Sequence, residues 1–182
     1  MKKIAVLFSG QGSNLAYLIE HLPRYDIEIS VALTNNPEAG GIQYAYQAGI
    51  SVEIIDSKSY THREDFDKEM VEILGKYPID LTVLAGFMRI LTPVFTSQIE
   101  AINLHPSLLP RHKGLHAIER SYGDEYTHGG VTVHRVTSEL DGGEVVLQKQ
   151  VDKSSITYDQ YYQAIRHIEK EALLEAVVEI LG

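Results

Sequence analysis

The sequence has no cysteine among its 182 residues, and basic residues are scarce. The lack of cysteine excludes disulfides, thiolate metal sites and a cysteine nucleophile. It is also compatible with the reducing cytoplasm, which we expect as the location. Only 16 Lys and Arg stand against 25 Asp and Glu, so the net charge is −9. Because phosphate backbones bind clusters of Lys and Arg, we expect no nucleic-acid partner.

Long hydrophobic runs are absent as well. No run approaches the roughly 20 apolar residues of a membrane span, so we expect no membrane association. The first eight residues carry two lysines and then a short apolar run that ends at Ser9-Gly10. This pattern fits a strand better than a signal peptide. The length suits one domain with a substantial core, and we expect a single domain over residues 1–182.

Apolar runs that alternate with amphipathic segments dominate the first half of the chain. The continuous apolar run at residues 4–8 is typical of a buried parallel strand, and we expect further strands at residues 27–33, 52–55 and 81–85. Two later runs, at 131–136 and 144–151, flank a Gly-rich turn and predict an antiparallel hairpin. The sequence therefore predicts an α/β fold: an open, mostly parallel twisted sheet with helices on both faces and an antiparallel hairpin at one edge.

Three helix starts have recognisable signatures. Thr61 with Glu64, and Thr157 with Gln160, have the spacing of a capping box. We expect the first of these helices to reach about residue 77 and the second about residue 181. Thr92 before Pro93 predicts a third start, with threonine as N-cap and proline at the first helical position. Shorter helices are expected at 15–22, up to 48, and at 117–122.

The segment Asn103-Leu104-His105-Pro106 is the first candidate for chemistry. In a strand alternate side chains share a face, so Asn103 and His105 are expected to point the same way. Pro106 forces the backbone out of the sheet, which places both groups at the carboxyl end of a strand, where ligands usually bind in α/β sheets. Alternatively, the two side chains only cap the strand and satisfy the turn.

A glycine-rich loop follows the first predicted strand. The run from Gly10 to Asn14 leads into a helix, so free backbone N–H groups and a helix N-terminus meet there and form an anion site. A dinucleotide fingerprint needs a third glycine, where Leu15 stands, and an acid after the second strand, where the sequence reads Thr34-Asn35-Asn36. We therefore expect a single phosphate. The alternative is a tight turn without a ligand.

Five charged or titratable residues are ambiguous when each is considered alone. Asp141 precedes Gly142, which is ordinary turn chemistry. His134 suits a packed position, while Arg63 and Arg89 could each bind an anion or simply reach solvent. Glu169 lies within about 40° of the apolar stripe of the last helix, where a carboxylate is costly without a partner. It either binds a ligand or bends out to water.

Four segments together resemble the formyltransferases that use 10-formyltetrahydrofolate. They are Ser9 to Leu15, Gly86 to Leu91, Asn103 to Pro110, and Leu140 to Gly143. The glycine loop is similar to that of the members that act on glycinamide ribonucleotide. The resemblance covers nearly the whole chain. It implies the Rossmann-like formyltransferase fold and formyl transfer to the ribonucleotide amine in purine (IMP) biosynthesis. It also implies the folate as co-substrate, no metal, and a monomer or homodimer.

The resemblance also implies residue roles. The catalytic residues would be Asn103, His105 and Asp141. The substrate phosphate would bind Gly12, Ser13 and Asn14, and its amine would bind Glu169. The folate contacts would be Arg63, Arg89, Ile90, Leu91, Asn103, Leu140 and Asp141. His134 matches a histidine of secondary importance beside the site.

The implied chemistry suits these residue types. An amine attacking a formyl carbon creates an oxyanion, to which Asn103 and His105 can donate hydrogen bonds. Asp141 can carry the proton from the amine, directly or through water, and can orient His105. The sequence departs from the family at 116–130, which is about a residue short, and at Arg166, where glutamine is common. Because of these departures, the resemblance does not determine which residues form the pocket walls.

Other functions fit parts of the pattern. A formyltransferase acting on another amine, such as an amino-sugar nucleotide, has the same chemistry. The enzyme that acts on methionyl-tRNA would need an additional domain and a basic surface, and the known deformylases carry an additional amino-terminal domain. A metal hydrolase would use His105, His134 and Asp141, whose spacing matches no compact metal motif. A non-catalytic nucleotide-binding module would have no use for the catalytic set.

Overall fold

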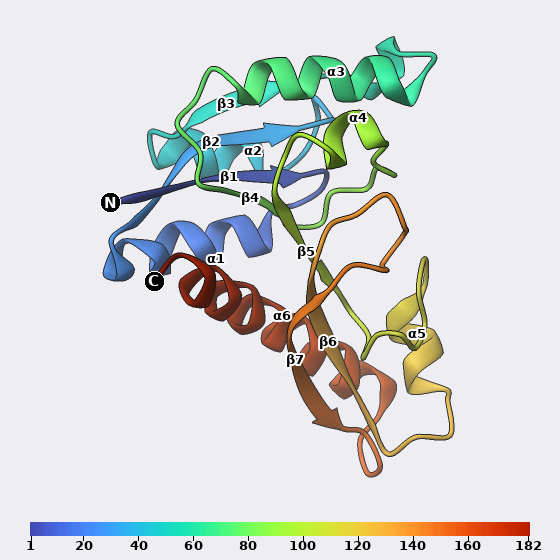
Figure 1. Ribbon diagram of the computed structural model, residues 1–182. Coiled ribbons are helices and arrows are strands. Elements are labelled where there is room, and N and C mark those ends of the chain that lie inside the picture. Colours follow the sequence, from blue (N-terminus) through green and yellow to red (C-terminus); the bar gives the residue numbers. More distant parts are fainter. The chain divides into compact units, whose positions relative to one another are not determined.

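The computed structural model describes residues 1–182, which divide into two compact units. The first unit contains residues 1–102 and 181–182, and the second contains residues 103–180. Figure 1 labels the strands and the α-helices. The strands are β1 (Lys2–Phe8), β2 (Ile27–Thr34), β3 (Ser51–Ile54), β4 (Leu81–Leu84), β5 (Ala101–His105), β6 (His128–Arg135) and β7 (Val145–Asp152). The helices are α1 (Ser13–His21), α2 (Ile42–Gln47), α3 (Arg63–Leu74), α4 (Pro93–Thr96), α5 (Ala117–Tyr122) and α6 (Tyr158–Leu181), with 3₁₀ turns η1 (Leu22–Tyr25) and η2 (Ser57–Ser59).

The first unit is built on parallel strands in the order β3-β2-β1-β4. Residues 4–8 of β1 are completely buried, as their continuous apolar run predicts. In Figure 1, α1 and α3 lie on opposite sides of these strands. Right-handed crossover connections explain this arrangement. The chain adds β2 and β3 on one side of β1 and then adds β4 on the other side, so the connecting helices pack on opposite faces of the strands.

The second unit contains the antiparallel hairpin. β6 and β7 pair from His128 opposite Asp152 to His134 opposite Val145, with a register shift between Val133 and His134. The strand order here is β5-β6-β7, with the hairpin at the end. The predicted fold class, a mostly parallel sheet with an antiparallel hairpin at one edge, is confirmed. The expected single domain over 1–182 stays a prediction.

Of the two predicted capping boxes, the one at α6 is present. The backbone N–H of Thr157 donates to Gln160 Oε1 at 2.9 Å, and the N–H of Gln160 donates to Thr157 Oγ1 at 3.2 Å. The reciprocal pair satisfies two N–H groups that the first helical turn leaves free.

The capping box predicted at Thr61 is wrong. α3 begins at Arg63, its N-cap is His62, and no side chain caps it. With His62 as N-cap, Glu64 stands at the second helical position, and the reciprocal bond needs it at the third. The helix also ends at Leu74, three residues before the predicted end. Gly75 ends it, and Pro78 disfavours helical backbone at the residue before it.

The start of α4 lies at Pro93, as predicted, but the threonine N-cap hydroxyl is used differently. Thr92 makes no side-chain bond to its own helix. Its N–H and its hydroxyl both donate to Asp67 Oδ2, at 2.7 Å each. Asp67 lies on α3 and is completely buried, so this carboxylate joins α3 to the start of α4.

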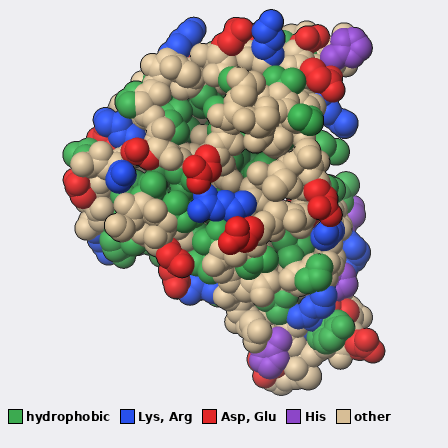
Figure 2. All heavy atoms as spheres, viewed as in Figure 1, with side chains coloured by type: hydrophobic (Ala, Val, Ile, Leu, Met, Phe, Trp, Pro, Cys, Tyr) green, Lys and Arg blue, Asp and Glu red, His purple; other side chains and the backbone are tan.

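The charged side chains on the face shown in Figure 2 are interspersed, with Lys and Arg next to Asp and Glu rather than gathered in one area. No large basic surface lies on this face. None of the helices has the length and apolar character that crossing a bilayer requires.

Candidate active site

The end of β5 places Asn103 and His105 in a shared polar cluster of the second unit. Asp141 lies 3.5 Å from His105 Nδ1 through one carboxylate oxygen and 3.7 Å from His134 Nε2 through the other. The Asn103 amide lies 3.3 Å from His134 Nε2. Strand alternation therefore predicts correctly that Asn103 and His105 reach the same place. Three of the four groups are buried: His105, His134 and Asp141.

Asp141 occupies a tight turn before β7 and has a positive φ of 53°. Aspartate tolerates this left-handed conformation better than most residues because its short side chain bonds locally. The N–H of Gly114 donates to Asp141 Oδ2 at 2.9 Å. Burial alone would raise the pKa of Asp141, but hydrogen bonding to the carboxylate, including the bond from Gly114, holds the pKa below its usual value. Asp141 is therefore a carboxylate at neutral pH.

His105 carries its proton on a defined nitrogen. Nε2 lies 2.8 Å from the carbonyl oxygen of His112, and a carbonyl can only accept, so Nε2 holds the hydrogen. Burial lowers the pKa of His105, which makes the neutral ring the main form at pH 7. Nδ1 is then an unprotonated nitrogen that faces Asp141. A proton held by Asp141 could pass to it.

His134 orients the amide of Asn103. His134 Nδ1 donates to the carbonyl of Arg135 at 2.9 Å, so its Nε2 is an acceptor. The Asn103 amide nitrogen donates to that acceptor at 3.3 Å. One of the two amide hydrogens is used in this bond, and the second is not directed at His134. The position of His134 therefore determines which way the Asn103 donor faces.

Glu169 points inward on α6, as its helical position indicates, and its side chain is only 4% exposed. Arg166, one turn earlier, donates from Nη1 to Glu169 Oε2 at 2.9 Å. The guanidinium offsets the cost of burying the carboxylate. The resemblance implies a glutamine at position 166, so this ion pair is a feature that the resemblance does not predict.

In the first unit, the glycine loop connects β1 to α1. Gly12 is the N-cap of α1 and has a φ of 77°. A side chain at Gly12 would meet the Cα of Gly41 at 2.5 Å, so the loop packs directly against that backbone. Gly41 also donates its N–H to the carbonyl of Gly10 at 3.0 Å. The loop is fixed, and the N-terminus of α1 lies at its end.

Asn14, in that first turn, is buried, and its Oδ1 has no hydrogen-bond partner. A buried polar atom without a partner is costly, so this oxygen is suited to a ligand donor. Because an amide oxygen only accepts, the matching ligand group is a hydroxyl or amine rather than a phosphate oxygen.

The predicted folate residues of the first unit lie around α3. Arg63 is the first residue of α3 and is exposed. The Arg89 guanidinium lies 4.2 Å from the centre of the Phe66 ring, and its Nε is buried without a partner. Ile90 is 49% exposed, whereas Leu91 is buried. In the second unit, Leu140 beside Asp141 is also exposed.

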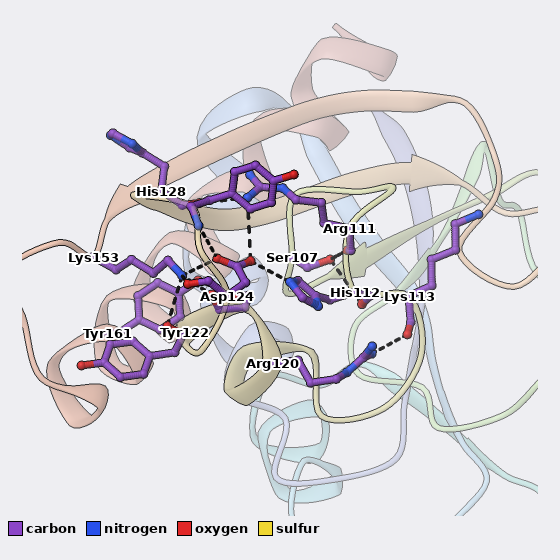
Figure 3. A network of polar contacts seen from close by, with 12 residues as sticks. Ser107, Arg111, His112, Lys113, Arg120, Tyr122, Asp124, His128, Lys153 and Tyr161 are labelled. Carbon is purple, nitrogen blue, oxygen red and sulfur yellow. Dashed lines mark hydrogen bonds and ion pairs between the residues drawn. The ribbon is translucent and has the colours of Figure 1, made fainter.

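Sequence reasoning missed a polar network that adjoins the cluster of His105 and Asp141. Figure 3 shows its members, with Asp124 between Lys153 and His112. A Gly-Asp dipeptide and one lysine among many carry no sequence signal for this arrangement. The only indication was that 116–130 departs from the family pattern, which marks the segment without identifying its partners.

No three His, Asp or Glu side chains are arranged to hold a metal ion. The rival interpretation as a metal hydrolase relied on His105, His134 and Asp141. The nitrogen–oxygen distances among these three side chains are 3.5 and 3.7 Å. His105 Nε2 is bonded to the backbone carbonyl of His112, so this nitrogen is engaged with a protein group and not directed at a shared ion.

Comparison with known proteins decides the family. The family model described as "Formyl transferase" matches residues 2–177. The chain belongs to the formyl transferase family. Among curated family members, phosphoribosylglycinamide formyltransferase of Escherichia coli (strain K12) is 40% identical over 152 residues, which cover 81% of this chain and 72% of that protein.

Other formyl transferase relatives extend the comparison. The human trifunctional purine biosynthetic protein adenosine-3 is 39% identical over 153 residues, covering 82% of this chain and 15% of that longer protein. The crystal structure of phosphoribosylglycinamide formyltransferase from Campylobacter jejuni has a TM-score of 0.96 at 46% identity, with 100% of this chain and 98% of that chain covered. The predicted resemblance is thereby confirmed.

Proposed function

We propose that this formyl transferase moves the formyl group of 10-formyltetrahydrofolate to the amine of glycinamide ribonucleotide, a step of purine biosynthesis. The observation that carries the proposal is the cluster of Asn103, His105 and Asp141, in which a buried carboxylate faces an unprotonated imidazole nitrogen. Relatives named phosphoribosylglycinamide formyltransferase support the choice of acceptor. The cytoplasm is the proposed location, and the monomer or homodimer stays a prediction.

The role proposed for Asn103 is stabilisation of the oxyanion. When the amine attacks the formyl carbon, the carbonyl oxygen gains negative charge. One amide hydrogen of Asn103 is directed to His134, and the other is available to that oxygen. Loss of one such donor typically lowers the rate by about 100- to 1,000-fold.

Asp141 and His105 are proposed to move the proton. The attacking nitrogen becomes cationic and must lose a proton, and the folate nitrogen must gain one as its bond to the formyl carbon breaks. Asp141 is an ionised base in the cluster and accepts the proton at a carboxylate oxygen, directly or through water. His105 Nδ1, 3.5 Å away, can share it. Because Nε2 of His105 is bonded to the His112 carbonyl, its contribution to the oxyanion is smaller than the sequence alone indicates.

The remaining roles concern binding. Gly12, Ser13 and Asn14 are proposed to hold the ribonucleotide, with the phosphate at the backbone N–H groups of α1 and a sugar hydroxyl at Asn14 Oδ1. Glu169 is proposed to hold the amine, sharing its carboxylate with Arg166. Arg63, Arg89, Ile90, Leu91 and Leu140 are proposed as folate contacts; exposed apolar side chains and the partnerless Arg89 Nε support this.

The test is the absorbance change when purified protein meets 10-formyltetrahydrofolate, with and without glycinamide ribonucleotide. We expect turnover only when the ribonucleotide is present. Breakdown of the folate without an acceptor would indicate a deformylase. Turnover with an amino-sugar nucleotide instead would identify a different acceptor, and binding without turnover would indicate a non-catalytic module.

A further inference from the structure

Lys153, the first residue after β7, is a buried cation with a complete set of partners. Its side chain is 4% exposed. Nζ donates to the carbonyls of Ser121 and Tyr122, at the end of α5, and to Asp124 Oδ1 at 2.6 Å. An ammonium group removed from water in this way must be paired, and here it joins β7 to the end of α5. The proposed reaction gives Lys153 no role.

Asp124 receives donors on both carboxylate oxygens. Oδ1 accepts from Lys153 and from the N–H of Tyr126, at 3.0 Å, while Oδ2 accepts from His112 Nε2 at 2.7 Å. Arg111 lies 3.8 Å from Oδ2. Although burial opposes ionisation, the bonds from Lys153 and His112 keep the pKa of Asp124 below its usual value. Asp124 is therefore charged and oriented (Figure 3).

His112 links this carboxylate to the catalytic cluster. Its imidazole is bonded to Asp124, and its backbone has a φ of 56°, a conformation that needs support in a non-glycine residue. Its carbonyl oxygen accepts the Nε2 hydrogen of His105 at 2.8 Å. The imidazole of His112 therefore determines where its own carbonyl stands, and that carbonyl determines which nitrogen of His105 carries the proton.

We propose that Lys153, Asp124 and His112 form a clamp that positions His105, with the unprotonated Nδ1 directed to Asp141. All three are positioning residues, because they act through His105 and have no proposed contact with the substrate or the folate. The inference rests on the proposed function only for its kinetic consequence. The tautomer and orientation of His105 follow from the geometry of the second unit alone.

The decisive variant is His112→Asn. Asparagine accepts the left-handed backbone at this position, but its side chain is too short to reach Asp124, and the bond between Lys153 and Asp124 remains. Asp124→Asn is the second variant and weakens both sides of the clamp. Matched controls are His167→Asn, at an exposed ion pair with Glu171, and Lys149→Met, which removes a half-buried lysine of β7 that pairs with Glu175.

Two readouts separate positioning from general structural support. The first is the split between kcat and the KM for glycinamide ribonucleotide. The second is the tautomer of His105, read from two-bond ¹H–¹⁵N correlation spectra of the full chain, with His105→Gln identifying the signal. We expect the wild type and both controls to show the Nε2–H form. For His112→Asn we expect a mixture of tautomers, with kcat lower by about 10- to 100-fold and KM little changed.

The proposal is overturned if folded His112→Asn keeps the Nε2–H tautomer of His105, whether or not its kcat falls, because a fall would then come from general structural damage. If Asp124→Asn does not fold, His112→Asn decides alone. If the wild type shows no turnover with the ribonucleotide, the proposed function fails, and the tautomer comparison still decides the clamp.

Discussion

Asp141 is the residue on which the proposed chemistry depends most. Its carboxylate lies within 4 Å of both His105 and His134, and hydrogen bonding, including the bond from Gly114, holds its pKa below the usual value. A base of this kind is useful only if it accepts a proton during the reaction and releases it again. A test of this role should therefore remove the charge of Asp141 and keep the shape of its side chain.

We predict that Asp141→Asn folds normally and that its kcat is lower by about 100- to 10,000-fold. Asparagine tolerates the φ of 53° and can still accept the Gly114 N–H, so the turn keeps its geometry. The amide cannot take up the amine proton. Steady-state kinetics and a thermal unfolding curve measure the two properties separately.

The matched control is Glu139→Gln in the same loop. Glu139 is 71% exposed and makes only a 3.6 Å contact with Lys113, so its charge is expected to have no effect on kcat. An Asp141→Asn enzyme with activity equal to this control would remove Asp141 from the mechanism.

At the scale of single residues, the sequence is informative where a regular element determines direction. The alternation of a strand placed Asn103 and His105 together, and helical geometry placed Glu169 inward. Asp124 and Lys153 lie in turns, where no period relates them, and they meet only through tertiary structure. The same limit explains why Arg166 was recognised as a departure but not as the partner of Glu169.

Among the elements, two helices offer a comparison because their sequences have the same capping pattern and different structures. Thr157 and Gln160 form the reciprocal bonds at α6, whereas Thr61 makes none at α3. We predict that Thr157→Ala lowers the free energy of unfolding by about 1 kcal/mol and that Thr61→Ala has little effect. Urea unfolding of both variants measures this. If both variants lose the same free energy of unfolding, the reciprocal hydrogen bonds observed at α6 do not account for the effect of Thr157→Ala.

The glycine loop allows a second comparison. We predict that Gly12→Ala lowers the free energy of unfolding by about 1–3 kcal/mol, because a side chain there meets the Gly41 Cα at 2.5 Å and φ is 77°. It should also raise the KM for the ribonucleotide, since the phosphate loop must move. Gly10→Ala is the control: no atom lies within 4 Å of the added carbon.

If Gly10→Ala and Gly12→Ala destabilise the protein equally, the contact with Gly41 does not explain the glycine at position 12. A normal KM in destabilised Gly12→Ala would separate the loop from phosphate binding. The unfolding curve and the KM thus test the packing and the proposed site independently.

The positions of several elements are predicted closely. β1, β2, β4 and α5 lie where the sequence places them, within one or two residues. The boundaries of α3 were wrong, because capping depends on which residue first adopts helical backbone, and Thr61 lies one position too early. Thr92 shows a third outcome: the boundary was right, while its hydroxyl is bonded to Asp67 on another helix.

At the scale of the whole molecule, stability must depend on pH through the buried titratable groups of the cluster. The pKa of His105 is lowered from 6.5 by burial, so the unfolded chain binds more protons than the folded one just below that value. Stability from this group is complete above pH 6.5 and is lost as pH falls toward the folded pKa. Asp141, with a pKa below 3.8, adds a loss of the same sign in more acidic solution.

We predict that the free energy of unfolding falls less between about pH 7 and about pH 5 in His105→Gln than in the wild type. Without the imidazole, the unfolded chain no longer takes up a proton at this position, so this source of the pH dependence is lost. Loss of the bond to the His112 carbonyl lowers the free energy of unfolding at every pH. Urea unfolding at several pH values measures the slope, which is independent of that constant loss. His167→Gln is the control, because His167 is 71% exposed and should keep the wild-type slope. Parallel slopes for all three proteins would mean that His105 takes up its proton equally readily in the folded and unfolded chains, and the neutral buried imidazole on which the proposed proton path depends would have to be abandoned.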